Sequence, residues 1–402
     1  MLPAMNILQD KGATLRPNPG WAPLALGFRP FFLLAGAAGV LLIALWPLVW
    51  RGQISVAAHY GGVAWHAHEM LFGYTAAVVA GFLLTAVRNW TGIQTWTGRR
   101  LLGLALVWAA ARLLPWIAGV PSWLLVAVDV AFLPLVAFSL VKPLWQGQNR
   151  VNRIFLPLLG AMALANLLSH LQMLGVVEHI GDMRRVMLEL VLLLIAVVAG
   201  RVMPFFTQNV LPGFKAVQRA WVERTTFVLL VLIALVQCLP DPARAPLGAL
   251  WLVFGLVQLV RMAGWFEARL FKLPVLWVLH IGYAWLTLGA LLTGLAAFDL
   301  FPAPSALHAL TVGGVGVFTF GMMARVIRGH TGRPIDVNRG IAWAFIVMNL
   351  AALVRVFGTA WFGGHYARWV DVAGLLWVVA FVAFVWFYAP MLLRARPDGR
   401  PG

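Results

Sequence analysis

Long apolar runs recur along the whole chain at a length that suits a lipid bilayer. A membrane-spanning α-helix needs about 20 mostly apolar residues, and charged or Gly/Pro-rich breaks separate twelve such runs here. Their predicted bounds are 28–50, 65–87, 101–119, 122–141, 153–175, 186–206, 222–239, 246–264, 274–297, 305–327, 340–358 and 369–393. The pattern predicts an all-α membrane protein, a bundle of about 12 transmembrane helices.

Composition agrees with this class. Hydrophobic residues make up 62% of the 402 residues and charged residues 11%, and a soluble protein of this size has too little interior to bury so much apolar surface. A net charge of +17 would suggest nucleic acid in a soluble protein, but in a membrane protein Lys and Arg hold loops against anionic lipid. We therefore expect membrane lipid, and no nucleic acid, as a partner. The single cysteine, Cys238, excludes an internal disulfide, a cysteine-ligated iron–sulfur cluster and a CxxCH-type haem.

Lysine and arginine are divided unevenly between the two sides of the predicted bundle. One set of alternate connections, with both termini, holds 22 of the 30, the other set holds 7, and Arg201 lies inside a span. The outer set includes Arg112 and Arg355. Because positive residues stay inside, we expect cytoplasmic N- and C-termini. The connections are too short for a soluble domain, so we expect residues 1–402 to form a single polytopic membrane domain.

A faint repeat runs through the second, sixth and tenth spans, which end in Gly81…Thr91, Gly200…Thr207 and Gly321…Thr331. In addition, His68 precedes Arg88 by 20 residues, and His308 precedes Arg328 by the same 20. The spacing of four helices indicates a threefold pseudo-repeat, and chance similarity between glycine-rich helices is the alternative.

Four of the nine histidines are predicted to lie at one depth, near the outer face. They are His66, His68, His170 and His308, while His280 lies nearer the cytoplasm. A single histidine of this kind is explained by a hydrogen bond between helices, but four on three helices favour metal or haem. Neutral imidazole suits iron, copper and zinc alike.

The spacing of these residues refines the hypothesis. His66 and His68 are two residues apart, about 200° around a regular helix, so they face different groups unless the first turn is irregular. Asn166 lies one turn before His170 and suits an amide that supports a ligand. Glu69, Glu189 and Arg201 are further candidates, because charged groups at membrane depth usually serve a purpose such as proton transfer.

Glycines 313, 314 and 316 follow His308 in the tenth span. Each weakens a helix by about 1 kcal/mol relative to alanine and permits close approach. Tight packing against another helix and a flat macrocycle laid beside His308 are both compatible with this pattern.

Several longer motifs occur in order along the chain. They are Gly27-Phe-Arg-Pro-Phe-Phe32, Trp65-His-Ala-His-Glu-Met-Leu-Phe-Gly73, Arg88-Asn-Trp-Thr-Gly92, Gly200-Arg-Val-Met-Pro-Phe-Phe-Thr207, Leu279-His-Ile-Gly-Tyr283 and Gly329-His-Thr-Gly-Arg333. With these motifs the chain resembles the NnrS family over nearly its whole length. The resemblance implies a twelve-helix protein of the bacterial inner membrane that carries haem b and copper, responds to nitric oxide and protects against nitrosative stress. It leaves open the reaction and which histidine holds which metal.

Three functions are compatible with these features. The first is a redox enzyme that reduces or detoxifies nitric oxide, with His68 and His308 as haem ligands, His280 as a further haem candidate, and His66 and His170 for copper or a second axial position. Without a c-type haem motif, membrane quinol is the expected electron donor. The second is a protein that binds nitric oxide, haem or copper without turnover. The third is a transporter, which would favour binding groups near the membrane midplane. The sequence leaves the oligomeric state open.

Overall fold

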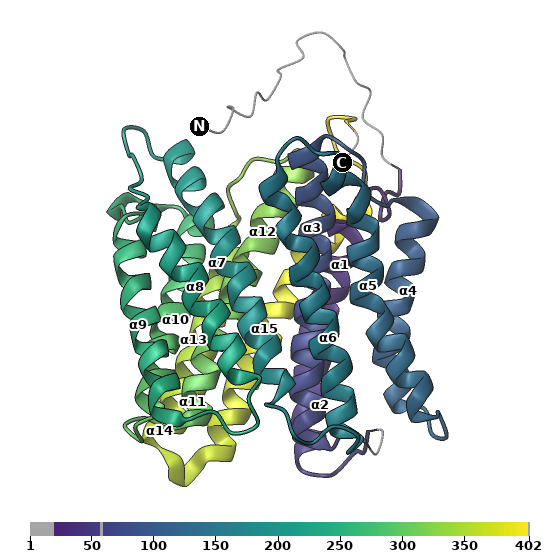
Figure 1. The fold of residues 1–402 in the computed structure, drawn as a ribbon. Coiled ribbons are helices and arrows are strands. Elements are labelled where there is room, and N and C mark those ends of the chain that lie inside the picture. Colours follow the sequence, from purple (N-terminus) through teal and green to yellow (C-terminus); the bar gives the residue numbers. More distant parts are fainter. Residues whose placement is uncertain (1–19, 57–58, 401–402) are drawn as a thin grey trace.

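The computed structural model describes residues 20–56 and 59–400. These residues form twelve helical spans (Figure 1). Their bounds are α1 Phe28–Trp50, α2 Gly62–His68 with α3 Ala76–Thr91, α4 Gly98–Leu113, α5 Ser122–Gln146, α6 Phe155–Met173, α7 Met183–Val210, α8 Ala220–Gln237, α9 Arg244–Ala263, α10 Pro274–Ala296, α11 Ala303–His308 with α12 Phe318–His330, α13 Arg339–Leu353 with α14 Thr359–Trp361, and α15 Tyr366–Leu393.

Short segments of other helix types interrupt or extend these spans. The π-helical segments are η1 Glu69–Thr75, η5 Ala309–Val317 and η6 Val354–Gly358, and the 3-10 segments are η2 Leu114–Trp116, η3 Arg150–Ile154, η4 Ala268–Lys272 and η7 Gly363–His365. Two of the π-helical segments begin directly after His68 and His308, the histidines with matched spacing in the sequence.

The helix count confirms the prediction from the apolar runs. In the described part of the chain, 11 helices are long and apolar enough to cross a membrane, and the protein is therefore a multi-pass membrane protein. The remaining span, α4, is short and carries three arginines, Arg99, Arg100 and Arg112. The predicted break before the fourth span is also confirmed. Gly119 there has φ +80°, a left-handed conformation that glycine adopts without strain, and α5 begins just after Pro121.

The two described ends of the chain meet at one end of the bundle. Ala22 N donates to Leu393 O at 2.8 Å, and Ala395 N donates to Gly20 O at 2.9 Å. An even number of spans requires this arrangement. We call the opposite end, where α1 ends and α2, α7 and α9 begin, the distal end.

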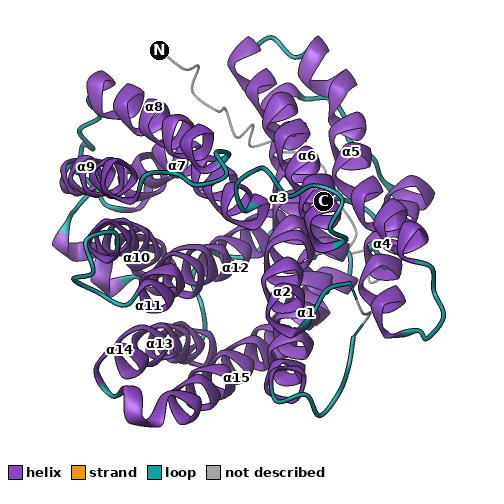
Figure 2. Ribbon diagram, turned by 60° about the horizontal axis from the view of Figure 1, so that its bottom comes forward, coloured by secondary structure: helices purple, strands orange, loops and turns teal. Residues whose placement is uncertain are grey.

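The second, sixth and tenth spans lie toward the middle of the bundle (Figure 2). In their most apolar stretches 89%, 83% and 78% of the residues are buried inside the protein, against 33% for the span that contains α15. These inner spans are the ones that carry the recurring glycines and threonines. The three are four spans apart, which is the spacing of the predicted pseudo-repeat.

Candidate metal centre

The second span changes from α-helix to π-helix directly after His68. A π-helical turn has i→i+5 hydrogen bonds and is associated with functional sites. In η1 the carbonyls of Phe72 and Gly73 accept hydrogen bonds from side chains of α4, namely Arg112 Nη1 at 3.0 Å and Trp108 Nε1 at 3.0 Å. These hydrogen bonds therefore join the second span to α4 about one turn after His68.

Three buried side chains from three spans converge beside this turn. His68 Nε2 lies 3.2 Å from Asp129 Oδ2, and His170 Nε2 lies 3.0 Å from the same oxygen. Asp129 comes from α5 and His170 from α6. One ligand atom from each residue lies within 4.8 Å of the other two, and the side chains are at most 2% exposed. We call this group the His68–Asp129–His170 triad.

Asn166 and Glu69 hold the triad in place. Asn166 Nδ2 donates to Asp129 Oδ2 at 2.8 Å, and Asn166 Oδ1 lies 3.2 Å from His68 Nε2. Glu69 Oε1 lies 3.4 Å from His68 Nδ1, a distance at the limit for a hydrogen bond. Asn166 is one turn before His170, and the structure brings both of them to the same carboxylate.

Arg112 balances the two buried carboxylates. Its Nε lies 2.8 Å from Glu69 Oε2, and its Nη2 contacts Asp129 Oδ1. A buried charge is costly unless it is paired and hydrogen-bonded. Gly73 permits this approach, because a Cβ there would lie 3.0 Å from both Arg112 Nη1 and Glu69 Oε2.

The connection between α1 and α2 covers the triad. The Tyr60 ring lies 5.0 Å from the His68 ring and 5.7 Å from the His170 ring, and the His59 ring lies 5.9 Å from that of His170. Burial lowers the pKa of His59 to about 4, so this imidazole is neutral at pH 7. Within the described chain, the buried atoms His59 Nε2, Tyr60 Oη and His170 Nδ1 have no hydrogen-bond partner. Such orphaned polar atoms indicate that the site is built to hold something further.

His66 and His308 belong to a second group at the distal end. The His66 ring stacks on Trp46 with ring centroids 4.3 Å apart. His308 Nδ1 lies 2.7 Å from Pro304 O, and His308 Nε2 lies 3.2 Å from Arg355 Nη2. Because Arg355 lies in η6, this contact links the tenth and eleventh spans.

The four histidines that were predicted to lie at one depth thus have separate surroundings. His68 and His170 share Asp129, whereas His66 stacks on Trp46 and His308 contacts Arg355, as the two-residue spacing of His66 and His68 suggested. His68 and His308, the predicted pair of haem ligands, share no contact partner among the described residues.

The glycines of the tenth span lie against neighbouring helices, which supports a role in helix packing, and the alternative of a flat macrocycle beside His308 stays a prediction. A Cβ on Gly313 would lie 2.6 Å from the Trp285 indole, and one on Gly316 would lie 2.6 Å from the Trp377 indole. Gly314 faces the backbone of Leu286. These contacts support the packing role of the three glycines.

The remaining candidates lie elsewhere. His280 Nδ1 lies 3.0 Å from Leu276 O, and the His280 ring also interacts with the Trp265 backbone. Arg201 Nη1 donates to Asn152 Oδ1 at 2.7 Å, away from the triad. Glu189 lines a separate cavity near the start of α7.

The sequence reasoning missed Asp129, the residue at the centre of the site. The signal was present, since Asp129 is the one acidic residue in the predicted span 122–141 and an acid in such a run usually has a partner. Arg112 and Arg355 were assigned to outer connections by the charge count, and this was wrong. Each lies within a helical segment and contacts a candidate histidine group.

The fold and the site together define a multi-pass membrane protein with a buried, histidine-containing candidate metal centre. A family model described as NnrS protein matches residues 22–396, nearly the whole chain, so the protein belongs to the NnrS family. Membership suggests a role in the nitric oxide response. A search of curated proteins found no match.

Proposed function

We propose that the protein holds a copper ion at the His68–Asp129–His170 triad and that it is an inner-membrane haem and copper protein which binds nitric oxide and removes it by reduction. The main support is the convergence of two imidazole nitrogens and one carboxylate oxygen within 4.8 Å. Membership of the NnrS family supports the link to nitric oxide, and the distribution of Lys and Arg favours a periplasmic position for the distal end.

The spacing of the donor atoms suits a small metal ion. Four ligands around an ion at about 2.0–2.1 Å stand roughly 3.3 Å from one another in a tetrahedron. The imidazole nitrogens of the triad lie 3.2 and 3.0 Å from Asp129 Oδ2, close to this spacing, and all three ligand atoms lie within 4.8 Å of one another. Imidazole and carboxylate accept several divalent metals, and Cu²⁺ is the strongest binder in the first-row series.

Haem b requires a different histidine. The Nε2 atoms of His68 and His308 face Asp129 and Arg355, whereas the His280 ring has no charged partner in the described structure. His280 Nδ1 lies 3.0 Å from a backbone carbonyl, which is how proteins commonly orient a metal-binding imidazole. His280 would therefore be available to hold haem b, which would supply redox chemistry when bound.

The proposed reaction is reductive. Two nitric oxide molecules take up two electrons and two protons to give nitrous oxide and water, with membrane quinol as the electron donor, and the metals supply the redox chemistry when bound. The protein's own residues hold and shield the site. Arg112 holds the Asp129 carboxylate in place. Tyr60 and His59 cover the imidazoles and limit access of water.

Anaerobic consumption of nitric oxide by the purified protein with a short-chain quinol tests this proposal, together with copper analysis of the same samples. We expect the wild type to contain copper and to consume nitric oxide faster than free haem, and His170→Ala to lose both properties. His365→Ala is the matched control, because His365 is exposed at the distal end. A wild-type rate no greater than that of free haem would contradict reduction, and full copper in His170→Ala would contradict the site.

A further inference from the structure

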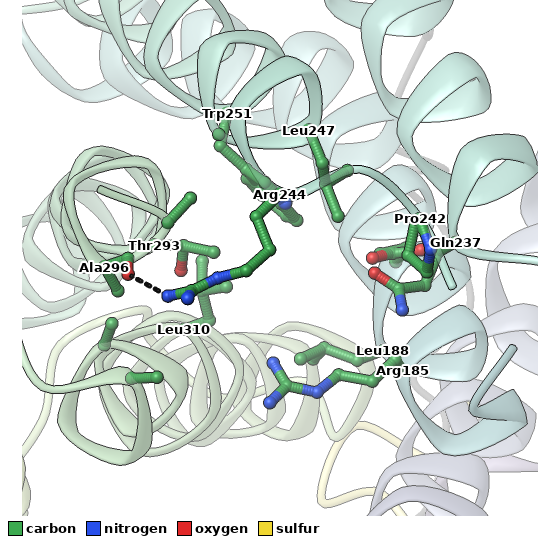
Figure 3. A pocket seen from close by; sticks show the side chains of 15 residues that line it. Arg185, Leu188, Gln237, Pro242, Arg244, Leu247, Trp251, Thr293, Ala296 and Leu310 are labelled. Atoms are coloured by element: carbon green, nitrogen blue, oxygen red, sulfur yellow. Dashed lines mark hydrogen bonds between the residues drawn. The ribbon is translucent and has the colours of Figure 1, made fainter. Parts of the chain in front are cut away.

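A cavity that is partly open to the outside lies at the distal end, apart from the triad. It is a cavity of about 210 Å³ between α7, α9, α10 and α11 (Figure 3). Its polar lining includes Arg185, Glu189, Gln237 and Arg244. None of the triad residues lines it.

Glu189 is a buried acid with one carboxyl oxygen that lacks a hydrogen-bond partner in the described structure. Its side chain is 3% exposed, and its Oε2 atom has no hydrogen-bond partner among the described residues. Leaving a buried carboxyl oxygen without a partner costs free energy. A ligand in the cavity that donates a hydrogen bond to Glu189 would remove this cost.

Two guanidinium groups line the same cavity as this acid. Arg185 precedes Glu189 by one helical turn, and its side chain extends into the space between the helices (Figure 3). Arg185 forms no ion pair with any carboxylate in the described chain, whereas Arg244 Nη2 donates to Asp299 Oδ1 at 2.7 Å and to Ala296 O at 3.4 Å. Arg185 is therefore the group left to donate to a ligand.

The walls between these polar groups are apolar. They are formed by Leu188, Leu247, Trp251 and Leu310. An apolar cavity of about 150 Å³ accepts a benzene molecule in another protein, so 210 Å³ accommodates one substituted ring. A small inorganic anion would match the arginines but would leave the apolar walls without a partner.

The cavity lies next to the second histidine group. Leu310, which lines it, follows His308 by two residues. A ligand in the cavity would consequently lie beside the His66 and His308 group at the distal end.

We propose that this cavity binds the head group of a membrane quinol, with one ring hydroxyl donating to Glu189 and the other ring oxygen accepting from Arg185. A quinol combines the required parts, namely an apolar ring, two oxygens on opposite sides and solubility in the bilayer. The inference rests on the proposed function in one respect, because reduction of nitric oxide requires an electron donor of this class.

Calorimetric titration of the purified, metal-containing protein with a short-chain benzoquinol under anaerobic conditions tests the inference. We expect saturable binding to the wild type, with at least tenfold weaker binding to Arg185→Leu and Glu189→Gln. Arg184→Leu is the matched control, because Arg184 is the neighbouring arginine, pairs with Asp182 at 3.0 Å and does not line the cavity. We expect it to bind the quinol like the wild type.

Ala303→Phe provides a second route if a charge variant fails to fold, since Ala303 lines the cavity and a larger side chain there fills it. Loss of quinol binding in this variant supports the inference. Unchanged quinol binding in these cavity variants overturns it, as does a wild type that binds benzoate or nitrite but no quinol.

Copper content, measured on the same samples, reports separately on the triad. Loss of copper with retained quinol binding would count against the proposed metal site alone.

Discussion

Arg112 Nε lies 2.8 Å from Glu69 Oε2 inside the bundle, and the same guanidinium contacts Asp129. One cation thus serves two buried carboxylates. With neutral imidazoles, the group carries a formal charge of about −1 before any metal binds, because two anions face one cation. A bound copper ion would offset this remaining charge, so the ion pair and the proposed metal are parts of one electrostatic arrangement.

Removing the cation should destabilise the protein strongly. Arg112→Leu leaves Glu69 and Asp129 as buried anions without a partner, and breaking such a pair costs about 3–5 kcal/mol. We expect a large fall in the thermal unfolding midpoint of metal-free protein in detergent. Arg51→Ala is the control, because Arg51 pairs with Asp371 at 2.6 Å on the exposed surface and such pairs contribute about 1 kcal/mol or less. Equal effects of the two substitutions would contradict a buried ion pair.

Gly73→Ala should disturb the same pair without changing its charge. The new Cβ would lie 3.0 Å from both Arg112 Nη1 and Glu69 Oε2, and overpacking of this kind costs about 1–3 kcal/mol. We expect lower thermal stability and weaker copper retention during dialysis against a chelator. At Gly103, in α4, a Cβ meets nothing within 4 Å, so Gly103→Ala should stabilise the helix by up to about 1 kcal/mol. A neutral Gly73→Ala would show that the pair does not need the glycine.

Substitutions in the two groups of histidines should differ in their effect on copper content. His68→Ala and His170→Ala should lose copper, because each removes an imidazole from Asp129. His66→Ala and His308→Ala should keep it, because these residues contact Trp46 and Arg355 instead. Elemental analysis of the four purified variants decides the point. Loss of copper from His308→Ala would restore the single ring of histidines expected from the sequence.

The glycine face of the tenth span should matter for packing whether or not haem is present. Gly316→Ala places a Cβ 2.6 Å from the Trp377 ring, and Trp377 Nε1 is itself held by Gly39 O at 2.9 Å. We expect a loss of about 1–3 kcal/mol in protein made by haem-deficient cells. Gly160→Ala, where a Cβ meets nothing within 4 Å, should cause no loss. An effect of Gly316→Ala confined to haem-containing protein would contradict the packing role.

The sequence was sufficient to predict the number of spans and the end of the bundle that holds His68 and His170. Both follow from the positions of apolar runs, which depend on each segment by itself. The link between Asp129 and these histidines did not follow, because it depends on which helices are neighbours and how each is rotated about its axis. A single sequence carries little information on either.

The π-helical turns bear on the matched spacing of His68 and His308. They widen the second and tenth spans immediately after His68 and His308, and so change the direction of every side chain that follows relative to a regular helix. The matched spacing of 20 residues therefore coincides with a shared backbone feature, and the assignment of both histidines as haem ligands stays a prediction. Asp129 could have been found as the isolated acid in an apolar run.

Electron paramagnetic resonance of the Cu²⁺-loaded protein tests the central claim most directly, because nitrogen ligands split the copper signal. The account predicts a splitting pattern from two histidine nitrogens in the wild type, from one in His68→Ala or His170→Ala, and an unchanged pattern in His365→Ala. A wild-type spectrum without nitrogen splitting, or one that both substitutions leave unaltered, would contradict a copper centre at His68, Asp129 and His170.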